Sequence, residues 1–135
     1  RGVDHGFAPG VFGVVQGLRV DVGVRARVWH ESGGQLAPLP TADAQRFLVT
    51  TPNFLEAARS SFAGVSGLES PYSTERGASG ELQNIIAAGY TSIAGMLGAH
   101  RFHHVAADDM SCVDPQHTTE VISRVQRFMA NSLPA

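Results

Sequence analysis

Apolar residues along this chain change repeatedly between the spacing of a strand and the spacing of a helix, and this change limits the choice of fold. Residues 22–28 alternate between apolar and other side chains, which is typical of a strand with one buried face. Residues 121–129 instead place apolar side chains at helical spacing, after the Asp114-Pro115 pair that typically starts a helix. The alternation predicts an α/β fold in which helices cover the faces of a layered sheet.

Local signals predict the position of each element. The expected elements are a helix over about 7–18, a strand over 22–28, a loop carrying Pro38 and Pro40, a helix over about 52–63 that Thr51 caps, a helix from the cap Ser79 to Gly89, a buried strand over 91–97, and a final helix from Asp114-Pro115. A chain of 135 residues is long enough for one such domain, so residues 1–135 are expected to form a single domain.

Composition and charge exclude several classes of function. Apolar residues make up 43% of the chain and charged residues 16%, as in ordinary globular proteins. A net charge of −2 offers no basic surface for nucleic acid or for an anionic membrane. All ten basic residues are arginine, which excludes Schiff-base chemistry and a phosphate site centred on lysine. No apolar run reaches the roughly 18 to 20 residues of a membrane span.

The single cysteine, Cys112, cannot form an internal disulfide and is expected to be a small buried residue. The sequence leaves the cellular compartment undecided, and a secreted protein is one of the alternatives.

The densest group of side chains that can bind a metal lies between the expected strand at 91–97 and the final helix. It comprises His100, His103, His104, Asp108 and Asp109. Enzymes of the α/β class place their sites where strand ends meet loops. A metal-binding imidazole usually has its second ring nitrogen held by an acceptor, and either Asp108 or Asp109 can supply one. The simpler interpretation is an acidic turn in solvent.

The segment from Phe102 to Pro115 resembles the closing motif of the M28 family of zinc exopeptidases. In that motif a metal-binding histidine is followed four residues later by an aspartate, and then by a helix start similar to Val-Asp-Pro. The two adjacent histidines after an aromatic residue look most like the carboxypeptidase Q branch of the family. The resemblance implies that His104 binds zinc, with His103 and Asp108 supporting it from the next layer of contacts.

Three further segments resemble parts of the same family. Glu81, ahead of an Ala-Gly turn, takes the place of an acidic residue that supports the site; alternatively, it only stabilises the first turn of a helix. Asp4 resembles the aspartate that bridges two zinc ions. Glu31, followed by Ser32 and two glycines, matches two family segments. One contains paired glutamates, a general base and a zinc ligand, and the other contains a ligand followed by a glycine turn. With either match, Glu31 is the functional position. Without a site, Glu31 would simply belong to a polar strand end in solvent.

The implied function is zinc-dependent hydrolysis of peptide or dipeptide termini. In the family, two zinc ions activate a shared water and polarise the scissile carbonyl. Asp4 would bridge the metals, Glu31 would bind zinc or act as the base, and His104 would complete a metal shell. Because family domains are much longer, we expect a fragment or a shortened relative, completed by a further segment or chain.

Two other functions are open at this point. One is a non-catalytic α/β domain that keeps the peptidase scaffold as a binding module. It accounts for the presence of Ser32 where a second glutamate would follow Glu31. The other is a serine hydrolase, for which the chain has no Gly-x-Ser-x-Gly motif. If zinc is bound, Glu31 and His104 should lie together, because strand ends of a parallel sheet share one edge.

Overall fold

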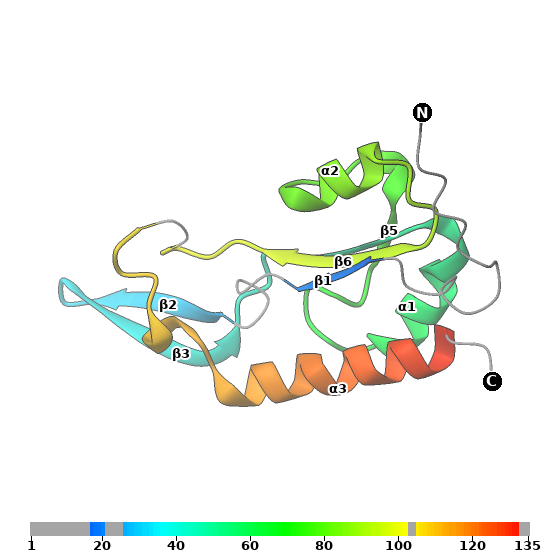
Figure 1. Cartoon of the computed structure of the whole chain (residues 1–135). Coiled ribbons are helices and arrows are strands. Elements are labelled where there is room, and N and C mark those ends of the chain that lie inside the picture. Colours follow the sequence, from blue (N-terminus) through cyan, green and yellow to red (C-terminus); the bar gives the residue numbers. More distant parts are fainter. Residues whose placement is uncertain (1–16, 21–25, 103–104, 133–135) are drawn as a thin grey trace.

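The computed structural model describes residues 17–20, 26–102 and 105–132. In these ranges a four-stranded sheet carries helices on both faces, and a two-stranded hairpin extends from one end of it (Figure 1). This arrangement confirms the expected α/β class.

The described strands are β1 (Gly17–Val20), β2 (Arg27–Ser32), β3 (Gln35–Ala42), β4 (Arg46–Thr50), β5 (Tyr72–Ser73) and β6 (Ile93–Gly98). The helices are α1 (Leu55–Ser61), α2 (Glu81–Ala87) and α3 (Pro115–Ser132), with single 3₁₀ turns η2 (Pro52–Phe54), η3 (Thr74–Arg76) and η4 (Met110–Cys112).

The main sheet has the order β1-β6-β4-β5 and mixes both strand directions. β6 runs parallel to β1 and antiparallel to β4, with Val49 opposite Gly95. The short strand β5 pairs with β4 in parallel. β2 and β3 form a separate antiparallel hairpin and make no ladder with the main sheet.

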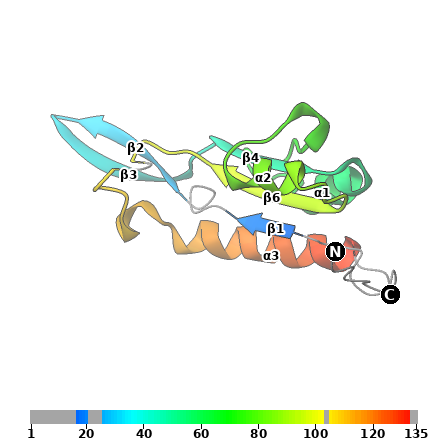
Figure 2. The same ribbon diagram turned by 45° about the horizontal axis from the view of Figure 1, so that its top comes forward.

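Alternate residues of β4 and β6 point to opposite faces of the sheet and so build two cores. Leu48 and Met96 belong to a buried cluster shared with α1 and α3. Val49 and Ile93 belong to a second cluster with Leu82 of α2. The views in Figures 1 and 2 accordingly place α2 and α3 on opposite sides of β6. The expected strand at 91–97 is therefore confirmed as buried on both faces, although it begins at Ile93.

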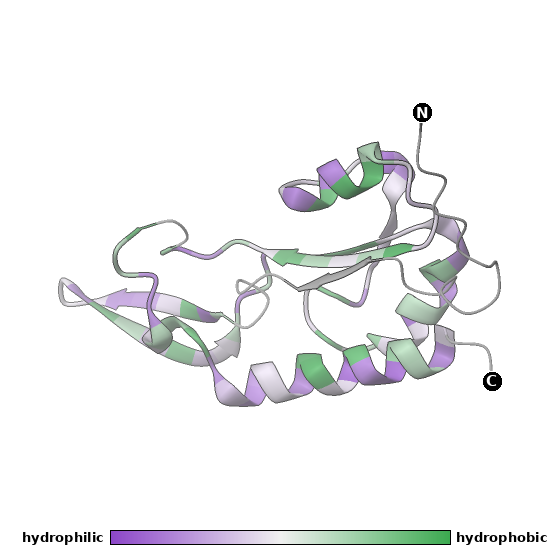
Figure 3. Ribbon diagram, viewed as in Figure 1, coloured by the Kyte–Doolittle hydropathy of each residue, from purple (hydrophilic) through white to green (hydrophobic). Residues whose placement is uncertain are grey.

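The final helix is also confirmed. Asp114 caps α3, because its Oδ1 accepts hydrogen bonds from the backbone N–H groups of Gln116 and His117 at 2.8 and 3.0 Å. Val121 and Phe128 are buried, while the exposed residues of the helix include polar side chains together with Ile122 and Met129 (Figure 3). Apolar packing against α1 therefore decides which side of α3 faces inward.

The helices expected at 52–63 and 79–89 both form, with different starts from those predicted. The first opens with the turn η2 and continues as α1, but the Thr51 side chain does not cap it. The hydroxyl of Thr51 instead accepts a hydrogen bond from the backbone N–H of Ile93 at 3.1 Å, which joins β4 to β6. Gly80, not Ser79, is the N-cap of α2, and Glu81 lies in its first turn as expected.

Three other expectations need correction or lie partly outside the described residues. The segment carrying Pro38 and Pro40 is strand β3, not a loop. Proline is tolerated there because β3 pairs on one side only, and an open edge needs no backbone donor. The end of the expected early helix, residues 17–18, lies in β1, and residues 7–16 are outside the described ranges. The strand expected at 22–28 starts at Arg27 among the described residues and continues to Ser32.

Candidate metal centre

Of the segment between β6 and α3, residues 99–102 and 105–114 lie beside the β2–β3 hairpin (Figures 1 and 2). Three contacts hold the two together. Ala26 forms an isolated backbone bridge with Val113, and Arg27 makes an ion pair with Asp114 at 2.8 Å. The ring of Trp29 packs edge-on against that of Phe102, with centroids 4.9 Å apart. The path of this segment is thus set by the hairpin as well as by the sheet.

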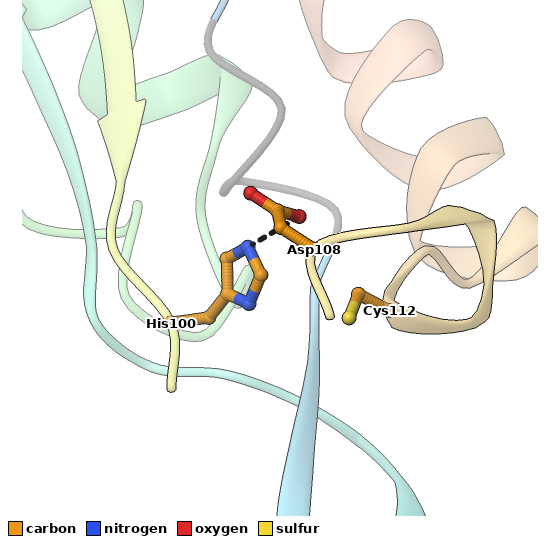
Figure 4. Close-up of side chains that lie close together, drawn as sticks. All are labelled: His100, Asp108 and Cys112. Carbon is orange, nitrogen blue, oxygen red and sulfur yellow. Dashed lines mark ion pairs between the residues drawn. The ribbon is translucent and has the colours of Figure 1, made fainter. Parts of the chain in front are cut away.

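The contacts bring His100, Asp108 and Cys112 together (Figure 4). His100 Nε2 lies 3.3 Å from Asp108 Oδ1. One donor atom from each of the three residues, an imidazole nitrogen, a carboxylate oxygen and the thiol sulfur, lies within 4.8 Å of the other two. The group therefore has the residue types and the closeness of a metal centre.

Two of these side chains are buried and the third reaches solvent. The His100 side chain is 2% exposed and that of Asp108 is 27% exposed, while Cys112 is buried. The Cys112 thiol donates a hydrogen bond to the backbone carbonyl of Ala107, with 3.3 Å between sulfur and oxygen. An ion would therefore approach from the side of Asp108.

Cys112 is the last residue of the turn η4, and it is buried. Asp109 caps this turn, since its Oδ1 accepts from the backbone N–H of Ser111 at 2.8 Å and from the Ser111 hydroxyl at 2.6 Å. These two hydrogen bonds lower the pKa of the Asp109 carboxyl. Asp108 and Asp109 were both expected as possible acceptors for a histidine. Among the described residues, Asp108 is the one of the two that contacts an imidazole, which is that of His100.

Glu31 lies on β2 opposite Leu36, close to the glycine turn of the hairpin, and its side chain is exposed. It is not a member of the group formed by His100, Asp108 and Cys112. Glu31 does not lie at the edge of a parallel sheet, contrary to the expectation, because β2 pairs only with β3, in antiparallel, among the described strands.

The other expected site residues divide into two groups. Glu81 is exposed in the first turn of α2, outside the group around His100. Asp4, His103 and His104 lie outside the described residues.

Sequence reasoning did not single out His100 or Cys112 as ligands. His100 was part of the dense group of potential ligands, but it lies outside the family motif. Cys112 was expected to be a small buried residue, and it is buried. The available signal was the presence of histidine, aspartate and cysteine in one short segment between a buried strand and a capped helix.

Comparisons of the chain with protein-family models, with curated proteins and with solved structures find no match. Among the described residues, no helix has the length and apolar character needed to cross a membrane.

Proposed function

We propose that this chain is part of a zinc-dependent exopeptidase similar to the M28 family, acting on peptide or dipeptide termini through a metal-activated water. The observation that carries the proposal is the ring contact between Trp29 and Phe102. It holds the strand that bears Glu31 against the segment that leads to His104.

Trp29 and Glu31 are two residues apart on β2, so their side chains leave the same face of the strand. His104 follows Phe102 by two residues in the sequence. Even in a fully extended chain, the Cα atoms of two such residues are at most about 7 Å apart. The ring contact and the short spacing in sequence on either side of it support a shared site for Glu31 and His104, although β2 is not part of the main sheet.

The donor types suit zinc. Carboxylate oxygen from Glu31 and Asp4 and imidazole nitrogen from His104 are ordinary zinc ligands. The Glu31 side chain is exposed, so it is accessible to an ion and to the end of a peptide. Zinc, when bound, lowers the pKa of a water and polarises a carbonyl. Glu31 would bind the metal or take the proton from the water, His104 would bind the metal, and Asp4 would bridge two ions.

Calorimetric titration with zinc tests this assignment. We expect His104→Ala and Glu31→Gln each to remove one class of bound zinc. His103→Ala is the matched control and should leave that zinc in place, because the family motif assigns its metal-binding histidine to His104. Equal loss from His103→Ala and His104→Ala would show that the assumed alignment with the family motif is wrong.

A second candidate is a non-catalytic α/β domain that keeps the peptidase scaffold and binds a partner. The observation that favours it is Ser32, which follows Glu31 on β2, so that this strand end carries one carboxylate where a paired motif carries a base and a ligand. Zinc titration that is unaffected by Glu31→Gln and His104→Ala would support this candidate over the peptidase.

A further inference from the structure

We propose that His100, Asp108 and Cys112 form a zinc site of their own, separate from Glu31 and His104, which fastens the segment between β6 and α3. The inference does not rest on the proposed peptidase function. It rests on three donor atoms of different kinds that converge within 4.8 Å of one another.

The distances are close to those of a zinc shell. Zinc bonds to nitrogen and oxygen are about 2.0–2.2 Å long and those to sulfur about 2.3 Å, so neighbouring donors in a tetrahedron lie roughly 3.3–3.7 Å apart. The pair formed by His100 Nε2 and Asp108 Oδ1 is already at 3.3 Å. Bringing the Cys112 sulfur into the shell requires a movement on the order of 1 Å.

The donor set selects the type of ion. Magnesium and calcium prefer oxygen ligands, whereas thiolate with imidazole favours zinc and related transition metals. A Cys112 thiolate and an Asp108 carboxylate together balance the two charges of the ion, and His100 binds as a neutral imidazole. Binding requires the thiol to lose the proton that it now donates to Ala107. The partly exposed Asp108 leaves a fourth position open to water.

The position of the three residues in the fold indicates which parts of the chain a bound ion would hold together. His100 follows the end of β6 in the chain, and Cys112 ends η4, which leads into α3. An ion bound to both would connect the end of β6 with the start of α3. Since it binds only where the three ligands have been brought together, it would stabilise the folded chain.

Cobalt(II) in place of zinc gives a test that is independent of activity. The full chain has one cysteine, so a thiolate-to-cobalt charge-transfer band in the near ultraviolet can arise only from Cys112. We expect this band in the wild-type chain, with the strong visible bands of tetrahedral cobalt. Asp108→Asn should weaken cobalt binding at least about tenfold. Asp109→Asn is the matched control and should keep the band, because Asp109 only caps η4.

Two outcomes would overturn the inference. The first is cobalt binding by the wild-type chain without the thiolate-to-cobalt charge-transfer band. This measurement does not depend on whether a variant folds. The second is loss of the band in His104→Ala or Glu31→Gln, which would show one shared site. A band that persists in those two variants supports a separate site, whether or not the peptidase assignment holds.

Discussion

The indole ring of Trp29 in β2 meets the phenyl ring of Phe102 edge-on, with centroids 4.9 Å apart and planes at 88°. These two rings connect the hairpin with the segment that carries the candidate metal centre. Pairs of this kind contribute about 0.5–1.5 kcal/mol beyond the burial of their surface. The contact is thus a specific attachment between two parts of the chain that share no strand ladder.

We expect Phe102→Ala to loosen this attachment and to expose Trp29 to water. Because Trp29 is the only tryptophan, its emission should shift to longer wavelength, and the free energy of unfolding should fall by about 1–3 kcal/mol. Fluorescence spectra and urea unfolding measure both effects. Phe47→Ala, at an exposed phenylalanine of β4, is the control and should leave the emission unchanged. An unchanged spectrum in Phe102→Ala would contradict the contact.

Asp114 should make stability depend on acid pH. The hydrogen bond from the His117 backbone N–H is the largest cause that lowers the pKa of Asp114. The backbone hydrogen bond from Gln116 and the electrostatic interactions with the His117 and Arg27 side chains lower it by smaller amounts. A carboxyl with a depressed folded-state pKa stabilises the fold fully above its ordinary value of 3.8, and this contribution is lost as the pH falls through the folded-state value.

Urea unfolding of Asp114→Asn as a function of pH measures this contribution. Asparagine keeps the capping oxygen but cannot titrate or pair with Arg27 as an ion. The variant should therefore be less stable than wild type at neutral pH, and the difference should shrink in acid. Asp114→Ala should be less stable still, since it also loses the cap. A constant difference between wild type and Asp114→Asn across the acid range would refute the assignment.

A larger side chain at Gly95 in β6 should destabilise the chain. A Cβ atom built on Gly95 would lie 2.5 Å from Leu82 Cδ2, so Leu82 of α2 occupies the space above this glycine. We expect Gly95→Val to displace Leu82 and to cost about 1–3 kcal/mol in thermal or urea unfolding. In the double variant with Leu82→Ala, the cost of the valine should be smaller. Strict additivity of the two changes would argue against this packing.

The 135-residue chain by itself should show little or no aminopeptidase or carboxypeptidase activity, even with added zinc. A two-metal mechanism needs a closed set of ligands and a base, and Asp4, Glu31 and His104 are too few to complete the shells of two ions and also act as the base. Loss of a base alone commonly removes about 10² to 10⁴ in rate. The measurement is hydrolysis of dipeptides and aminoacyl fluorogenic substrates, with His104→Ala for comparison. Robust turnover that disappears in the variant would show that the site is complete.

The helix α3 and the strand β6 could be predicted from the sequence because their causes are local. The Asp114-Pro115 start and the helical spacing of apolar residues act within a few turns of one helix. The apolar run of β6 needs only burial on both faces, which a central strand provides. The α/β class followed from such elements.

Tertiary structure decided what these local patterns left open. Pro38 and Pro40 indicate a loop when the sequence is taken alone, and they fit a strand because β3 has an open edge. Strand β4 begins with the charged residue Arg46, whose Nε donates a hydrogen bond to the Ser66 carbonyl at 2.8 Å in the folded chain. The separation of β2 from the main sheet depends on pairing between distant residues. The meeting of His100 with Asp108 and Cys112 depends on the path that the hairpin contacts impose, since a spacing in sequence specifies direction only within a regular helix or strand.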